Sequence, residues 1–119
     1  MDEQGMQRAR EAKTRIKEIE PRGAMHRLAT GDDVIFLDVR EPHEWNLFHI
    51  PGALHVPLGE VENRVQEVVP RDRDVIVYCG GGNRSAIAAD TMQELGYARV
   101  ASMSEGVRGW VNAGGAVEE

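Results

Sequence analysis

The segment DVIVYCGGGNRS, residues 74–85, changes within a single residue from an apolar run to three glycines. Residues 75–79 are apolar and mostly β-branched or aromatic, which is typical of a strand buried on both faces. The next stretch, residues 86–95, has the composition and spacing of a packed helix, and Gly96 follows as its C-terminal cap. We therefore expect a strand, a glycine loop and a helix in direct succession.

A second apolar run, Val34 to Leu37, stops at Asp38-Val39-Arg40 and predicts another buried strand with Asp38 at its carboxyl end. Shorter strands are expected just before Pro21 and at residues 53–56 and 100–103. Apolar residues at helical spacing predict the remaining helices at residues 21–30, 42–47, 60–69 and 106–113.

This alternation of strands and helices, joined by short connections, favours right-handed crossovers around a central, mostly parallel sheet. The expected fold class is therefore α/β. In the helix at residues 21–30, Met25 and Leu28 are expected to face inward. The tryptophans Trp45 and Trp110 flank apolar positions, so we expect both in the core.

The N-terminal residues 1–15 carry Met6, Ala9 and Ala12 at helical spacing among charged residues. They are expected to form an amphipathic helical extension. Residues 16–119 would then form the folded domain.

The composition limits the partners of this chain. Its 119 residues suit one domain, and 14 Lys and Arg against 20 Asp and Glu give a formal net charge of −6. Nucleic acids and anionic membranes are held mainly by clustered cations, so neither is expected as a partner. No apolar run approaches the roughly 18 residues that span a bilayer, and the charged start is unlike a signal peptide. A cytoplasmic protein is expected.

Cys79 is the only cysteine, so its thiol cannot form an internal disulfide. In parallel sheets, ligands bind beyond the carboxyl ends of the strands, where Cys79 lies. The residues that follow it are Gly80, Gly81, Gly82, Asn83, Arg84 and Ser85. Glycine amides pointing to a common centre, together with the positive end of the next helix, favour an anion such as the cysteine thiolate. Arg84 adds a fixed cation, which suits an anionic substrate or a persulfide.

Each part of this loop also has a purely structural interpretation, because a lone cysteine is often a small buried apolar residue and three glycines often form a plain turn. A plain turn needs neither the cysteine nor the arginine, so the combination indicates an active loop with Cys79 as nucleophile. A dinucleotide fingerprint would open a larger domain, and a Walker loop would need Gly-Lys before Ser85. The four histidines lack a zinc-binding order, and no metal or other cofactor is expected.

A cysteine nucleophile followed by an arginine is also found in cysteine phosphatases and arsenate reductases, which are the main alternative to an enzyme that binds a single sulfur atom. These enzymes place five residues between the cysteine and the arginine, whereas four separate Cys79 from Arg84. The smaller loop suits a single sulfur atom better than a tetrahedral phosphate.

Three ordered blocks of the sequence resemble signatures of the rhodanese family of sulfurtransferases. They are the loop at residues 79–85, the stretch at residues 37–40 with Glu44-Trp45 and residues 49–53, and the closing stretch at residues 96–100 with Gly106 and Trp110. The resemblance implies a three-layer fold with a central five-stranded, mostly parallel sheet flanked by helices.

The same resemblance implies ping-pong transfer of sulfane sulfur, with Cys79 passing through a persulfide that the loop amides hold. Asp38 and Arg40 would lie beside the loop, and Arg40 would pair with Glu44 to brace it. The other interpretation of these three residues is a surface ion pair with a strand-end cap.

The expected donors are thiosulfate or a persulfide, and a cysteine desulfurase could supply the persulfide. The acceptor would be cyanide, a thiol or a sulfur-accepting protein. Many thiosulfate-using members carry a cation just after the cysteine, whereas residues 80–82 are all glycine here, so thiosulfate is expected to be a poor substrate. Many members also have a glycine at the position of Glu105. The alternative is a persulfide carrier or a non-catalytic regulatory module that binds another protein.

Overall fold

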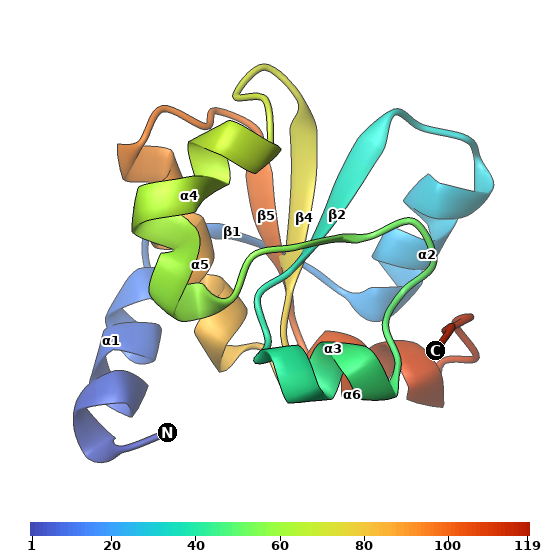
Figure 1. Cartoon of the computed structure of the whole chain (residues 1–119), viewed down its shortest axis with the longest axis horizontal. Helices are drawn as coiled ribbons and strands as arrows, with labels where there is room; N and C mark the ends of the chain where they lie inside the picture. The colour runs from blue at the N-terminus through green and yellow to red at the C-terminus, as the bar shows by residue number, and fades with distance from the viewer.

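The computed structural model describes residues 1–119 and shows one sheet of five parallel strands in the order β1-β5-β4-β2-β3, with helices on both faces (Figure 1). The elements are α1 (Glu3–Lys13), β1 (Lys17–Ile19), α2 (Pro21–Ala29), β2 (Val34–Asp38), α3 (Pro42–Leu47), β3 (Leu54–His55), the 3-10 turn η1 (Leu58–Glu60), α4 (Val61–Val68), β4 (Asp74–Tyr78), α5 (Asn83–Glu94), β5 (Val100–Met103) and α6 (Gly106–Asn112). This confirms the expected fold class.

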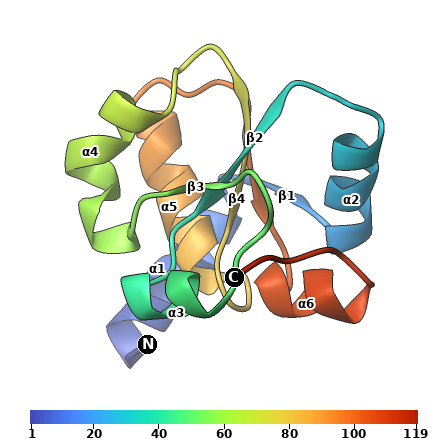
Figure 2. The ribbon, with the colours of Figure 1, turned by 45° about the vertical axis from the view of Figure 1, so that its right-hand side comes forward.

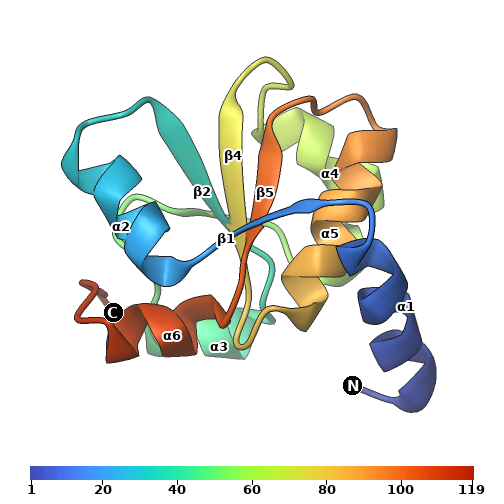
Figure 3. The ribbon, with the colours of Figure 1, turned by 180° about the vertical axis from the view of Figure 1, so that it is seen from behind.

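The sheet separates two apolar cores. Side chains alternate across a strand, so Val77 and the adjoining Cys79 face a core shared with α4 and α5. Ile76 and Tyr78 face the opposite core, shared with α2 and α6. The views from the front and from behind show these helix pairs on opposite sides of the strands, which gives three layers (Figures 1 and 3).

The first helix, α1, lies beside α5 (Figure 3). Asp2 caps its start by accepting a 2.8 Å hydrogen bond from the Gly5 amide. Ala9 and Ala12 are buried, and just after the helix Arg15 makes two hydrogen bonds to Asp90 on α5. α1 is therefore fixed along the same side of the sheet as α4 and α5.

Three local expectations need correction. Helix α5 begins at Asn83, three residues earlier than expected, because Gly82 takes a φ of 107° and ends the loop directly at the helix. The short strand near residues 53–56 is reduced to the two residues of β3. Leu28 is 43% exposed, because it lies in the last turn of α2, where Ala29 and the following Thr30 are exposed as well.

Both edges of the sheet are short, since β1 has three residues and β3 has two. In the turned view, β3 lies beside β2, next to the segment that leads to α4 (Figure 2).

None of the helices is long and apolar enough to cross a lipid bilayer.

Candidate active site

The carboxyl ends of β2 and β4 bring the predicted site residues to one end of the sheet. Asp38 is paired in register with Tyr78, and the Val39 amide donates to the Tyr78 carbonyl at 3.0 Å. Arg40 and Cys79 each follow directly. The sheet register therefore places the two chain segments side by side at the start of the glycine loop.

The loop wraps around the sulfur of Cys79, which is 1% exposed. The Gly82 amide donates to Sγ at 3.1 Å and the Ser85 amide at 3.3 Å. Both amides lie at the N-terminal end of α5, where the helix dipole favours negative charge. Gly82 has a positive φ of 107°, and a Cβ there would lie only 3.2 Å from the Glu105 nitrogen, so this position suits glycine. The arrangement favours a negatively charged sulfur.

A pair of buried serines extends this set of contacts. The Cys79 thiol lies 3.4 Å from Ser85 Oγ, and Ser85 Oγ lies 2.8 Å from Ser102 Oγ on β5. Both serines have no exposed surface. A buried hydroxyl keeps a hydrogen-bond partner, so Ser102 limits the directions in which the Ser85 hydroxyl can point.

Helix α6 supports the loop from the other side of the sulfur. The Val107 amide donates to the Cys79 carbonyl at 2.8 Å, and the Arg108 amide donates to the Gly80 carbonyl at 3.2 Å. Gly106 is required for this approach, because a Cβ there would lie 2.5 Å from the Cys79 and Gly80 carbonyl oxygens. Before it, Glu105 has a φ of 63°, the left-handed conformation that glycine adopts more easily.

Arg84 forms two hydrogen bonds with Glu44, at 2.6 and 3.0 Å. Glu44 also accepts a hydrogen bond from the Glu41 amide at the start of α3. The contact with Arg84 is the main reason that the pKa of Glu44 falls to about 2. The ion pair ties α3 to the first turn of α5.

The expected pairing of Arg40 with Glu44 is wrong. Arg40 instead pairs with Asp38 at 2.8 Å, and both side chains are buried. Asp38 also accepts from the Arg40 amide at 2.8 Å, and the guanidinium donates to the Phe48 carbonyl. Because Asp38 lies at the strand end, its carboxylate is close enough to bind both the Arg40 amide and the Arg40 side chain.

The two tryptophans have different positions. Trp110 is buried in the core, as expected, and packs edge-on against Phe36. Trp45 is only half-buried, so its expected place in the core is wrong. It stacks on His49, with ring centroids 3.5 Å apart, and on His55, with centroids 4.8 Å apart. Its helix, α3, has no fully buried residue.

A hollow of about 540 Å³ opens over the loop and reaches Cys79. Asn83 lies on its α1 side, where it accepts a hydrogen bond from Lys13 at 2.8 Å and contacts Met6. The remaining lining residues include Met1, Asp2, Leu58, Gly81, Arg84 and Arg108. No group of three or more His, Cys, Asp or Glu side chains is placed to hold a metal ion.

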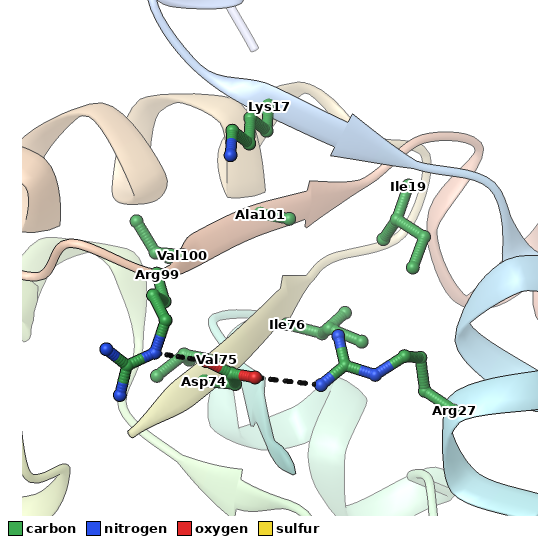
Figure 4. Close-up of a pocket in the computed structure, with 9 residues that line it drawn as sticks. All are labelled: Lys17, Ile19, Arg27, Asp74, Val75, Ile76, Arg99, Val100 and Ala101. Carbon is green, nitrogen blue, oxygen red and sulfur yellow. Dashed lines mark hydrogen bonds and ion pairs between the residues drawn. The ribbon is translucent and has the colours of Figure 1, made fainter. Parts of the chain in front are cut away.

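A second hollow lies at the opposite end of the strands (Figure 4). Its floor is apolar, and Asp74 lies between Arg27 and Arg99, with which it forms ion pairs. These arginines are therefore already neutralised in part. Its lining residues include neither a cysteine nor a serine, so Cys79 distinguishes the first hollow as the candidate active site.

Two residues near the sulfur were not found by sequence reasoning. Ser102 lies in a strand that reads as apolar, and only its polarity at a buried position could have drawn attention to it. Arg108 reads as an ordinary exposed helix residue between Gly106 and Trp110. Its place over the loop depends on the packing of α6, which local sequence does not reveal.

Comparison with known proteins agrees with this geometry. The family described as the rhodanese-like domain matches residues 21–113. A sulfurtransferase from Allochromatium vinosum is 36% identical over 99 residues, covering 83% of this chain and 92% of its own. A Bacillus subtilis protein provisionally named a sulfur carrier is 36% identical over 106 residues, which are 89% of this chain but only 57% of that protein.

Solved structures share the fold. A thiosulfate sulfurtransferase from Pseudomonas aeruginosa has a TM-score of 0.85 at 29% identity, over 97% of this chain and 22% of its own. A Rhodopseudomonas palustris protein of unknown function, whose description raises tyrosine phosphatase activity, also has a TM-score of 0.85. It is 32% identical, over 93% of this chain and 91% of its own.

Proposed function

This chain belongs to the rhodanese family, and from that membership we propose that it transfers sulfane sulfur through a persulfide on Cys79. The Cys79 thiolate attacks the sulfane sulfur of a donor, a new S–S bond forms, and the donor's own S–S bond breaks. The electron pair leaves with the donor fragment, which is sulfite from thiosulfate or a thiolate from a persulfide. An acceptor thiolate or cyanide then takes the outer sulfur and restores the Cys79 thiolate.

The observation that carries the proposal is the set of contacts to Cys79 Sγ. Two amides, from Gly82 and Ser85, and the Ser85 hydroxyl lie within hydrogen-bond distance of a sulfur that is almost fully buried. Preorganised donors of this kind stabilise an anion without reorientation during the reaction. They favour the thiolate before the transfer and the persulfide after it.

The remaining site residues take supporting roles in this proposal. Gly80 and Gly81 add no side chain of their own to the mouth of the loop, and Asn83 connects the loop to α1. The pair of Arg84 with Glu44 and the pair of Asp38 with Arg40 hold the loop's surroundings in place. Donor and acceptor are small sulfur compounds or proteins that present a persulfide or thiol, such as a cysteine desulfurase.

A persulfide carrier is the second candidate, and the provisional name of the Bacillus subtilis relative favours it. A carrier would load Cys79 but pass the sulfur only to a partner protein. Phosphatase chemistry is less well supported, because the guanidinium of Arg84 is already engaged by Glu44 instead of facing a phosphate.

The test is to incubate the reduced protein with thiosulfate, with an inorganic polysulfide, or with a cysteine desulfurase and cysteine, and to measure its intact mass. We expect a gain of one sulfur atom that reductant removes and that Cys79→Ser lacks. An enzyme should form many equivalents of thiocyanate per chain from thiosulfate or polysulfide with cyanide, whereas a carrier should form no more than about one equivalent and should release its sulfur faster to a protein acceptor. Hydrolysis of p-nitrophenyl phosphate without sulfur uptake would contradict the proposal, and uptake from no donor would favour a regulatory module.

A further inference from the structure

We propose that Arg108, on α6, recognises the anionic end of the sulfur donor and so selects donors that end in a small oxyanion, such as the sulfonate group of thiosulfate. This inference rests on the proposed function of Cys79. It assigns to a residue outside the loop the positive charge that the glycines at residues 80–82 cannot provide.

The position of the Arg108 guanidinium is the first argument. Its Nη2 atom lies 3.2 Å from the place where a Cβ of Gly81 would be, and 3.5 Å from that of Gly80. The guanidinium therefore occupies space that a side chain in the loop would fill. The Arg108 amide holds the Gly80 carbonyl, which fixes the base of the side chain against the loop. Arg108 and Cys79 line the same hollow.

The second argument is that Arg108 is unpaired. Its side chain forms no hydrogen bond and no ion pair with the protein, whereas Arg84 in the same hollow is bound by both oxygens of Glu44. The carboxylate of Asp2, also in the hollow, accepts from the Gly5 amide at the start of α1. Of the two arginines in the hollow, Arg108 is thus the one whose side-chain donors remain available to a ligand.

The positive charge of Arg108 would act in the first half-reaction, in which sulfur passes from thiosulfate to Cys79. When the Cys79 thiolate attacks the outer sulfur of thiosulfate, the S–S bond breaks and its electron pair goes to the departing sulfite. Negative charge on the sulfite oxygens increases as the bond lengthens. A guanidinium presents several donors in a plane and binds such oxyanions through two hydrogen bonds. Arg108 would therefore assist both the binding and the departure of the sulfonate group.

The experiment compares two donors in single-turnover loading of Cys79, followed by intact mass. The donors are thiosulfate and a hydropersulfide, RSSH, with an uncharged alkyl group. Attack of the Cys79 thiolate on the outer sulfur of RSSH breaks its S–S bond, leaves the persulfide on Cys79 and releases an alkyl thiolate without an oxyanion. We expect Arg108→Ala to load from thiosulfate about 10- to 100-fold more slowly, the range for loss of a charge-assisted hydrogen bond. Loading from the alkyl hydropersulfide should change less than about twofold. Arg108→Lys, which keeps the charge but not the planar pair of donors, should recover part of the rate.

A matched control is Arg71→Ala, which removes an exposed arginine from the connection before β4, at the opposite end of that strand from Cys79. It changes the net charge by the same amount and should leave both loading rates unchanged. An equal loss with both donors in Arg108→Ala, or no loss with thiosulfate, would overturn the role of Arg108 while the Cys79 proposal stands. Failure of the unaltered protein to load from either donor would overturn both.

Discussion

Cys79 has three polar contacts at its sulfur, and two of them come from Ser85. The Ser85 amide is fixed by α5, whereas its hydroxyl can rotate. The hydroxyl of Ser102 on β5 restricts that rotation, because no other side-chain contact holds Ser85 Oγ apart from the sulfur itself. At the residue scale, the sheet is thus connected to the surroundings of the sulfur through one hydrogen bond between buried serines.

This arrangement predicts that Ser85→Ala slows loading of Cys79 about tenfold, because one donor to the anion is lost. Ser102→Ala should slow it less, and the double variant should be no slower than Ser85→Ala alone, since Ser102 acts through Ser85. Single-turnover loading from one donor measures all three rates. Additive losses in the double variant would contradict this coupling, and Ser104→Ala, whose hydroxyl bonds the Ile19 carbonyl, is the control.

Sequence reasoning located the cysteine and the glycine loop that wraps around it, because a cysteine at a strand end before three glycines is a local pattern. The sequence did not predict which charged side chains form ion pairs with each other. Arg40 is bound by Asp38, two positions away, while Glu44 reaches Arg84, forty positions away. All these residues meet at one end of the sheet, and the choice among them depends on side-chain directions that only the packed structure fixes.

At the scale of elements, the turn into α6 determines how closely that helix approaches the loop. Glu105 adopts a left-handed φ of 63°, and the Gly106 that follows is also left-handed, at 56°. A left-handed conformation costs a residue with a side chain about 1–2 kcal/mol. Glycine avoids this cost, but it loses more conformational entropy on folding, which offsets part of the advantage. The glycine that many rhodanese relatives have at this position suits the backbone better.

Glu105→Gly is therefore expected to raise the free energy of unfolding by about 0.5–1 kcal/mol. Glu105→Ala removes the carboxylate but keeps the Cβ and its left-handed cost, so it should bring no gain. Urea denaturation of both variants measures the difference. A decrease in stability for Glu105→Gly would mean that the side chain contributes more to the start of α6 than the backbone conformation costs.

The number and kind of elements followed from the periodicity of the sequence, because buried strands and amphipathic helices leave local patterns. The first and last residues of these elements were predicted less accurately from the sequence. The start of α5 was expected at residue 86, whereas Gly82 begins the helix at Asn83 through its positive φ. A run of three glycines permits several such turns, and which one forms depends on how α6 packs against the loop, because the Val107 amide donates to the Cys79 carbonyl.

On the scale of the whole molecule, three carboxylates form four ion pairs between elements that are distant in the sequence. Glu44 binds Arg84, Asp90 binds Arg15, and Asp74 lies between Arg27 and Arg99. Hydrogen bonds from these arginines are the main cause that lowers the pKa of each carboxyl, that of Glu44 from 4.5 to about 2. The folded protein therefore keeps these groups ionised at a pH where the unfolded chain binds protons.

The free energy of unfolding should then fall as the pH drops below about 4.5, because the unfolded chain takes up more protons than the folded protein. The contribution of Glu44 is complete above its unfolded pKa of 4.5 and is lost as the pH approaches about 2. In Glu44→Gln, stability at pH 7 should be lower and its decline between pH 4.5 and 2 less steep. Urea denaturation across this range tests both, and parallel curves for the two proteins would contradict the assignment.

The short edge strands of the sheet limit how copies of this chain can associate. The edge strand β3 has two residues and the other edge strand, β1, has three. Few unpaired backbone groups are therefore available for strand pairing with a neighbouring molecule. Strand-by-strand stacking into fibrils has few places to start. A second molecule would have to recognise surfaces made by helices and loops instead, and so could approach the sulfur without disturbing the strands beneath it.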